Sequence, residues 1–438
     1  MNQRLRLGRI VFKPNVKALN LFSYCIIALF STCLIALINF IQPFLLTEFL
    51  NLPQAVQGAA SGSLAFWNEL VIIVMVGVFG SLSDRLGRPP IYAFGFFTMA
   101  IAYCLFPIAS SLNELIVFRV IFAVGAAAVT AMLATVLADY PEEEGRGKFT
   151  GLIGILNGLG IMMIVFFFSK LPFWLQNTTT SAQDAGSQTF YIICAVSLAI
   201  ALLAFTGLSW FKSEHNQDKG FKALFKEGLY AAKKPKIRLA YAAAFVSRGD
   251  LAIVGTFLSL WIIQDRSQQG MNTAEALKQA GMIFGISQGA ALLWAPIIGI
   301  ICDRKSRVFA MALALGLAAV GYCSLGFIDT PAGTAMIMAS ILLGIGEISA
   351  VIASQALIGE QSDSESRGAV VGWFGMFGAI GILISTKIGG FLFDNVHPSA
   401  PFTAIGILNG LVLIYACKVL WKSNANAEVP LSESPSRS

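Results

Sequence analysis

Twelve apolar runs follow one another along this chain of 438 residues. Each is close to or above the roughly 20 residues that a helix needs to cross the hydrocarbon core of a bilayer. A helix can cross because all its backbone groups are satisfied within the segment. Charged residues make up 12% of the chain, against roughly 25% in soluble domains. We therefore predict an all-α integral membrane protein with spans near residues 18–46, 64–82, 90–110, 114–138, 149–169, 190–210, 239–263, 280–301, 308–327, 334–358, 369–392 and 402–421.

A charged motif in the first half of the chain is repeated in the second half. The residues Gly80, Asp84, Arg85 and Arg88 recur, each 219 positions later, as Gly299, Asp303, Arg304 and Arg307. A second junction repeats with a shift of 221, from Arg146, Gly147, Gly151 and Gly154 to Arg367, Gly368, Gly372 and Gly375. An internal match at a fixed period indicates a repeated structural unit. The repeat therefore predicts two homologous six-helix bundles.

The repeat divides the chain into four parts. We expect an N-terminal bundle over residues 1–210, a linker over 211–238, a C-terminal bundle over 239–421 and a tail over 422–438. The linker is polar and basic, and residues 221–232 within it have an amphipathic pattern. Lysine and arginine concentrate on the cytoplasmic side of membrane proteins. Of the 30 in this chain, 24 fall on the side that carries both termini, 3 on the other side and 3 inside helices. Both termini, the linker and the tail are therefore expected to be cytoplasmic, most simply at a plasma (inner) membrane.

With twelve predicted helices in two halves and Gly-x-x-x-Asp-Arg-x-x-Arg after the second and eighth, the chain resembles the major facilitator superfamily over about residues 18–421. The residues around Arg119 are similar to a motif on the fourth helix of drug exporters, among other members. The chain departs from the antiporter pattern because residues 147–170 contain no proline, where a Gly-Pro pair is expected. The resemblance implies a secondary transporter that works by alternating access, with no enzymatic activity.

Six ionisable residues lie inside predicted spans: Glu69, Arg119, Arg248, Asp250, Glu347 and Lys387. A charge at the centre of a spanning helix costs about 2.5 to 3.5 kcal/mol, so the six together would cost about 15 to 20 kcal/mol if they were independent. They must therefore be paired, hydrated or functional. Arg248 and Asp250 are two positions apart, so on an intact helix their side chains diverge by about 200° and cannot share a face.

Each of these six residues has a functional and a structural interpretation. The resemblance implies that helices 1, 4, 7 and 10 line a central cavity, which places Arg119, Arg248 and Glu347 near it. These residues would then bind substrate, or they would form structural ion pairs. Glu69 and Asp250 are candidate proton carriers.

The structural alternative for Glu69 is a neutral acid that is hydrogen-bonded to a neighbouring helix. Asp250 could instead neutralise Arg119 or Lys387. The Lys387 side chain is expected to extend toward the interface between membrane and water.

The repeated motif predicts a latch between the two halves on the cytoplasmic side. We expect Asp84 to lie against the start of the helix at Arg367, and Arg88 to pair with Asp139. By the repeat, Asp303 would approach Arg146 and Arg307 would pair with Glu360. Arg85 and Arg304 complete the motif. The structural alternative is that these charges only fix the loops and the orientation of the chain.

We therefore predict a proton-coupled secondary transporter. Two arginines at membrane depth favour a small anionic or zwitterionic organic solute. One alternative is a multidrug or metabolite efflux proton antiporter, favoured by the Arg119 pattern and disfavoured by the missing proline. Another is a transport-inactive membrane receptor or scaffold. The expected partners are a small-molecule substrate and the lipid bilayer. We expect a monomer, no nucleic acid, no metal site and no cofactor beyond a proton gradient, and ATP drive is disfavoured because the chain lacks a Gly-x-x-x-x-Gly-Lys-Ser/Thr loop.

Overall fold

The computed structural model describes residues 5–8, 10–176, 181–210, 221–362 and 367–427. Within these ranges, twelve helical spans are long and apolar enough to cross a membrane. They are formed by α1 (Ala18–Phe44, continued by a π-helical turn at Leu45–Phe49), α2 (Gln54–Leu86), α3 (Arg88–Leu105), α4 (Leu112–Asp139), α5 (Arg146–Phe166, followed by the short α6, Leu171–Gln176), α7 (Ala182–Gly207), α9 (Pro235–Ile253, continued by a π-helical turn at Val254–Leu258 and by α10, Ser259–Gln268), α11 (Thr273–Arg304), α12 (Arg307–Ser324), α13 (Gly333–Gln361), α14 (Arg367–Asn395) and α15 (Ala400–Ala427).

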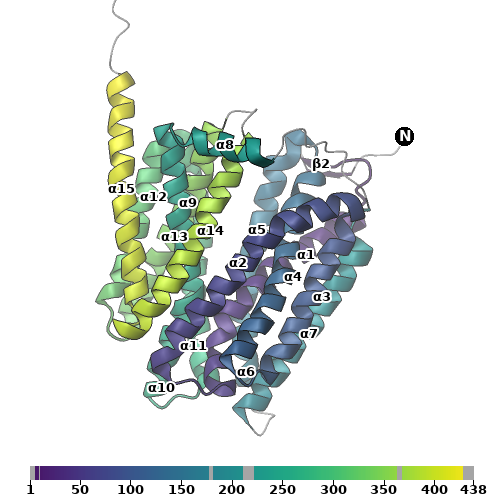
Figure 1. The fold of residues 1–438 in the computed structure, drawn as a ribbon, viewed down its shortest axis with the longest axis vertical. Coiled ribbons are helices and arrows are strands. Elements are labelled where there is room, and N and C mark those ends of the chain that lie inside the picture. Colours follow the sequence, from purple (N-terminus) through teal and green to yellow (C-terminus); the bar gives the residue numbers. More distant parts are fainter. Residues whose placement is uncertain (1–4, 9, 177–180, 211–220, 363–366, 428–438) are drawn as a thin grey trace, which may run out of the picture.

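The twelve spans form two bundles with the same packing pattern, and Figure 1 shows the two bundles side by side. In the N-terminal bundle α3 packs against α4 and α7, and α1 packs against α5. In the C-terminal bundle α12 packs against α13 and α15, and α9 packs against α14. The predicted all-α fold with two homologous six-helix bundles is confirmed. The first described residues and the end of α15 lie at the same end of the molecule.

Several helices begin earlier than the apolar pattern predicts. Helix α2 starts at Gln54 and α11 at Thr273, well before the apolar runs that begin near 64 and 280. Residues 171–176, 182–188, 265–268 and 273–279, which lie outside the predicted spans, are therefore helical as well. Ser181 and Asn272 cap the N-termini of α7 and α11, where their side chains accept hydrogen bonds from backbone N–H groups in the first turn. Capped polar turns thus extend these helices beyond the apolar runs.

Two small elements cover the end of the molecule that carries the termini. The strands β1 (Arg6–Leu7) and β2 (Ile10–Val11) pair antiparallel, and the Phe12 ring after them lies 5.3 Å from the Phe149 ring of α5. Helix α8 (Phe221–Ala231) packs against α14, so that a Cβ atom at Gly228 would lie 2.1 Å from the Trp373 side chain. Helix α9 then starts inside the range that was expected to be linker, and α15 continues into the expected tail as far as Ala427.

The two bundles touch closely at one end, which we call the closed end. It contains the start of α2 and the end of α14. A Cβ atom added at Gly62 would lie 2.4 Å from the Thr386 carbonyl oxygen of the other bundle, and one at Gly390 would lie 2.6 Å from the Gly58 carbonyl oxygen. Helices α5 and α11 also meet there, where a Cβ atom at Gly281 would lie 2.4 Å from the Ser169 hydroxyl oxygen. Only glycine allows backbones to approach this closely.

The opposite end, which carries the termini and the repeated motif, we call the open end. On α14, residues 368, 372, 375, 382, 386 and 390 follow one face at helical spacing. Gly390 at the closed end of this face contacts α2, whereas Cβ atoms at Gly368, Gly372 and Gly375 would meet nothing within 4 Å. Figure 1 shows α2 and α14 diverging toward this end. The bundles are therefore in contact at one end and separated at the other.

Candidate functional site

A cavity of about 190 Å³ lies between the two bundles, where their separation begins. Helices α1 and α2 line it from one bundle, and α9, its π-helical turn and α14 line it from the other. The lining residues are Asn39, Ala65, Asn68, Glu69, Arg248, Leu251, Ala252, Thr256, Ile382 and Thr386. Glu69 and Arg248 thus face one space from opposite bundles, and neutral polar groups surround them. A polar, interfacial cavity near the middle of the spans is where secondary transporters bind solutes.

Arg248 reaches this cavity because of its position on α9. Its aliphatic stem packs over Gly378 of α14, where a Cβ atom would lie 2.7 Å from the Arg248 Cγ atom. Its side chain is accessible to solvent, although protein atoms surround it. Asp250 instead is completely buried and faces α15. The predicted divergence of Arg248 and Asp250 is therefore present.

The first helix of each bundle contains a π-helical turn. In α1 the turn Leu45–Phe49 follows Pro43, which interrupts the hydrogen-bond ladder, and in the C-terminal bundle the turn is Val254–Leu258. A π-helical turn changes the direction of the side chains that follow it, and such turns are frequent at functional sites. Thr256 lies in the second turn and lines the cavity. No pattern of apolar residues marked either turn.

Arg119 lies behind the cavity wall and does not line it. Its side chain is 1% exposed and donates a hydrogen bond to Asn39 Oδ1, and Asn39 is a lining residue. The guanidinium carbon lies 5.2 Å from the centre of the Phe122 ring. Within the described part of the chain, its Nε and Nη1 atoms have no hydrogen-bond partner. Arg119 therefore holds Asn39, a residue of the cavity wall, in place.

Two acidic residues are buried inside the C-terminal bundle. Asp250 accepts a hydrogen bond from Asn409 Nδ2 at 2.9 Å, and Glu347 accepts one from Gln288 Nε2 at 3.3 Å. One carboxyl oxygen of each, and the Tyr322 hydroxyl group near both, has no partner among the described residues. Neither acid lines the cavity. The structure thus places Asp250 with Asn409 of α15, while Arg119 and Lys387, its two expected ionic partners, contact other residues.

The closed end is held by polar contacts between the bundles that the sequence did not predict. The carboxylate of Asp394 at the end of α14 accepts hydrogen bonds from the backbone N–H groups of Gly58 at 2.8 Å and Ala59 at 2.7 Å. Gln264 of α10 donates to Gln57 Oε1 at 3.0 Å.

The Nζ atom of Lys387, which was expected to extend toward the membrane–water interface, lies 3.2 Å from Ser63 Oγ of the other bundle. This end is therefore held together by polar residues of both halves.

The repeated motif forms equivalent ion pairs at the open end. Arg88 donates to Asp139 at 2.9 Å, to Asp84 at 2.7 Å and to the Ser83 hydroxyl at 2.9 Å, and its side chain is 3% exposed. Arg307 lies 3.1 Å from Asp303 and 3.5 Å from Glu360, and its side chain is 26% exposed. One ion pair was expected within each bundle, Arg88 with Asp139 and Arg307 with Glu360. Both pairs are present.

Two contacts between the bundles were expected at the open end, Asp303 with Arg146 and Asp84 with Arg367. The structure does not bring the first pair together, and the second involves a side chain that lies outside the described residues. Asp303 is exposed and forms its ion pair with Arg307, and Arg146 is exposed on α5. Arg85 and Arg304 are exposed as well. The side chain of Arg367, the expected counterpart of Asp84, lies outside the described residues.

Three comparisons with known proteins agree with this architecture. A family model described as Major Facilitator Superfamily matches residues 24–386 and, in a second match, 240–437. The chain is 28% identical to the magnetosome protein MamH of Paramagnetospirillum magneticum, over 87% of this chain and 88% of that protein. It is 29% identical to the magnetosome protein MamZ of Magnetospirillum gryphiswaldense, over 87% of this chain but 59% of MamZ, so it spans little more than half of that relative.

Among solved structures, the nucleoside transporter NupG has the same fold, with a TM-score of 0.71 at 15% identity over 92% of this chain and 99% of that one. The family match extends over most of the chain, and the fold, the repeat and the interfacial cavity accord with it. The chain belongs to the Major Facilitator Superfamily of membrane transporters.

Proposed function

We propose that this protein is a proton-coupled secondary transporter for a small organic anion or zwitterion. The observation that carries the proposal is the placement of Arg248 in the cavity between the bundles. A guanidinium group binds carboxylate and phosphate oxygens through two parallel hydrogen bonds. The amides of Asn39 and Asn68 and the hydroxyl of Thr386 surround it and offer neutral polar partners for the rest of the solute.

The charges in the cavity suggest how a proton would be coupled to the solute. With Glu69 ionised, the cavity holds one positive and one negative side chain. A bound monoanion would leave one uncompensated negative charge at membrane depth, which costs about 2.5 to 3.5 kcal/mol. A proton on Glu69 removes that charge. Solute and proton would therefore be carried together, and Glu69 would release its proton when Arg248 is again without solute.

The buried acids of the C-terminal bundle support a second, separate role. Asp250 and Glu347 have polar partners but no cationic partner among the described residues. An ionised carboxylate without a cation is costly in a buried site, so such groups are stable as neutral acids. We assign them to the packing of α9, α13 and α15 and to the polarity behind the cavity, and we place the coupling step at Glu69.

We further propose that the two contact regions alternate. In the described state the closed end is held by Asp394, and the open end gives access to the cavity. In the alternative state the contacts at Asp394 would separate. The open-end faces that carry Gly147, Gly151 and Gly154 on α5 and Gly368, Gly372 and Gly375 on α14 would then approach α11 and α2. The lysine and arginine distribution supports a cytoplasmic location for the open end. The described state is then inward-facing, in a plasma (inner) membrane.

The experiment is uptake by the purified full chain in proteoliposomes. The probes are radiolabelled acetate, succinate, glutamate and citrate, each with and without an imposed pH gradient. Because charge-assisted hydrogen bonds contribute about 1.5 to 3 kcal/mol, Arg248→Gln should lower uptake by about tenfold or more. Arg248→Lys should retain part of it. Glu69→Gln should transport without a response to the pH gradient. Lys148→Gln, an exposed charge removal outside the cavity, is the matched control.

Three results would contradict the proposal. Transport of cationic drugs but of no anion, unaffected by Arg248→Gln, would favour the efflux antiporter. An absence of flux for every solute, with no dependence on Asp84 or Arg88, would favour a receptor or scaffold. Uptake of anions that is equally driven by pH in Glu69→Gln would place the coupling step elsewhere.

A further inference from the structure

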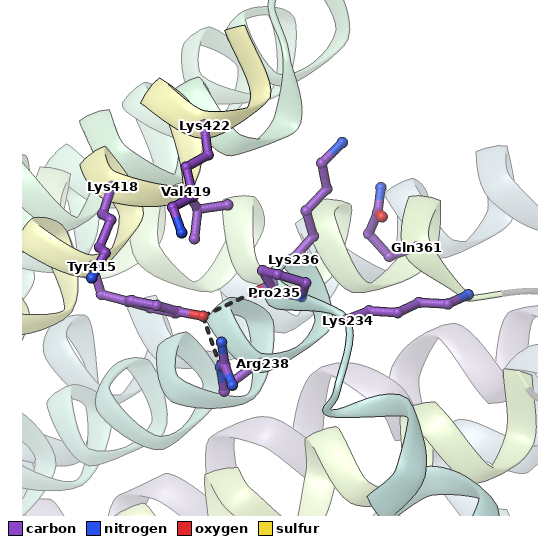
Figure 2. Close-up of a pocket in the computed structure, with 9 residues that line it drawn as sticks. All are labelled: Lys234, Pro235, Lys236, Arg238, Gln361, Tyr415, Lys418, Val419 and Lys422. Atoms are coloured by element: carbon purple, nitrogen blue, oxygen red, sulfur yellow. Dashed lines mark hydrogen bonds between the residues drawn. The ribbon is translucent and has the colours of Figure 1, made fainter. Parts of the chain in front are cut away.

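A second cavity, of about 570 Å³, lies at the open end of the C-terminal bundle. It is separate from the interface between the bundles. The first turn of α9, the last turn of α13 and the end of α15 surround it, as Figure 2 shows. Its lining residues are Lys234, Pro235, Lys236, Arg238, Gln361, Tyr415, Lys418, Val419 and Lys422. Nothing in the transport cycle proposed above uses this cavity.

The lining is strongly and uniformly basic. Five of the nine lining residues are lysine or arginine, and none is acidic. The Arg238 guanidinium is positioned by Tyr415, to whose hydroxyl it donates at 2.8 Å and whose ring centre lies 5.6 Å from its central carbon. In Figure 2 the ammonium groups of Lys236, Lys418 and Lys422 extend around the cavity and not toward one another. Such an arrangement favours an anionic occupant, because the positive side chains repel one another and an anion bound between them removes that repulsion.

The backbone adds to this positive potential. Lys234 is the N-cap of α9 and Pro235 its first residue, so the N-terminus of this helix lies at the wall of the cavity. The unpaired N–H groups of a first turn and the helix dipole stabilise negative charge. Phosphate groups are therefore better partners here than neutral polar molecules.

The level of the cavity in the membrane indicates where the anion would come from. The span of α9 begins at Pro235 and that of α15 ends at Lys422, so the basic residues lie where the apolar parts of the helices end. Beside the cavity, the surface of α15 is apolar: the side chains of Leu411, Ile414 and Trp421 are 57%, 68% and 71% exposed. Exposed apolar side chains on a spanning helix contact acyl chains, and tryptophan is enriched at the interface with water. The occupant should thus carry an anionic group and acyl chains.

We propose that this basic cavity is a binding site for the phosphate headgroup of an anionic phospholipid. Basic pockets between transmembrane helices bind such headgroups, and each lysine or arginine near the surface contributes about 1 kcal/mol. The four cations Lys236, Arg238, Lys418 and Lys422 exceed what one phosphate needs, so a lipid with two phosphates should bind more tightly than a lipid with one. The bound lipid would join α9, α13 and α15, and it would stabilise the C-terminal bundle.

The test is native mass spectrometry of the purified full chain with added diphosphatidylglycerol, phosphatidylglycerol or phosphatidylethanolamine. The triple variant Lys236→Gln/Arg238→Gln/Lys418→Gln should bind the two anionic lipids about 100-fold more weakly, which corresponds to about 1 kcal/mol for each charge removed. Binding of phosphatidylethanolamine should not change. The matched control is Lys13→Gln/Lys148→Gln/Lys305→Gln, which removes three exposed charges at the same end.

A second variant keeps the test valid if the triple variant does not fold. Lys418→Glu reverses one exposed charge and should selectively weaken anionic lipid binding. Equal losses in the triple variant and in its control would overturn the proposal, because charge alone would then be the cause. Inorganic phosphate is the second probe. If it alone raises the unfolding temperature through these residues and the lipids do not bind, the site is for a soluble anion and the proposal is wrong.

Discussion

The carboxylate of Asp394 should control how strongly the closed end stays closed. Its two oxygens bond to backbone N–H groups near the start of α2, across the boundary between the bundles. In Asp394→Asn the carbonyl oxygen can keep one of these bonds, whereas the amide group is directed at the other N–H. A hydrogen bond to a charged group contributes about 1.5 to 3 kcal/mol, so the closed arrangement should weaken by roughly 10- to 150-fold relative to the alternative state. A population of about 99% would fall to between roughly 90% and 40%.

Distances between spin labels measure this change directly. The seven natural cysteines are first replaced, and new cysteines at Asn113 and Thr330 report on the closed end from equivalent turns of the two bundles. A second pair, at Lys148 and Lys305, reports on the open end. Asp394→Asn should populate a longer distance at the closed end and a shorter one at the open end.

The control for this experiment is Asp265→Asn, which makes the same change at the same end. Among the described residues, the Asp265 carboxylate bonds to Gln269 and lies near Arg266, both of its own bundle. Both distance distributions should therefore stay as in the unmodified chain. The reasoning about Asp394 is refuted if Asp394→Asn and Asp265→Asn give the same distributions, or if the closed end widens while the open end does not respond.

Three further outcomes are expected. Gly390→Ala places a Cβ atom 2.6 Å from a carbonyl oxygen of α2, so the bundles should separate at the closed end. The spin-label distances at that end should lengthen as expected for Asp394→Asn, and unchanged distances would contradict the close backbone approach at Gly390. Arg88→Ala should destabilise by about 3 kcal/mol, because it removes a buried cation that binds Asp139, Asp84 and the buried Ser83 hydroxyl. The more exposed Arg307→Ala should destabilise by about 1 kcal/mol or less, and equal unfolding temperatures in detergent would show that the repeats contribute alike. Asn409→Leu should destabilise the fold by about 1 to 3 kcal/mol, because it leaves the buried Asp250 carboxyl without its partner, and the added change Asp250→Leu should recover much of that loss. A double-mutant cycle on unfolding measures the coupling, and additive losses would show that Asn409 and Asp250 do not interact.

The repeated motif was enough to predict the architecture because it is encoded in residue types at fixed positions. Gly80 to Arg88 and their copies 219 positions later imply duplication without any knowledge of contacts. The same local information predicted the pair of Arg88 with Asp139, and helical geometry predicted that Arg248 and Asp250 would diverge. These predictions depend only on spacing along one element or on a known motif.

Most of the cavity lining and the polar contacts at the closed end could not be predicted in that way. Asp394 and Gly58 are 336 positions apart, and a carboxylate that accepts from backbone N–H groups has no partner side chain to identify it. The lining amides and hydroxyls, such as Asn39 and Thr386, are neutral, so they carry no strong penalty that would mark them in an apolar run. Asn409 was a signal that could have been used, because a lone asparagine in an apolar helix needs a partner. The π-helical turns have no signature beyond Pro43, and they rotate the residues after them out of a regular helical register.

The glycine-lined face of α14 has a practical consequence. At Gly372 a large side chain would enter unoccupied space in the described state, but it would occupy the space that a closing partner helix requires. The Gly372→Trp variant should thus fold and remain in the conformation in which the open end is separated. Such a variant would suit the selection of antibodies that recognise a single conformation of the transport cycle. It would also separate solute binding from solute movement, since binding would continue while turnover stopped.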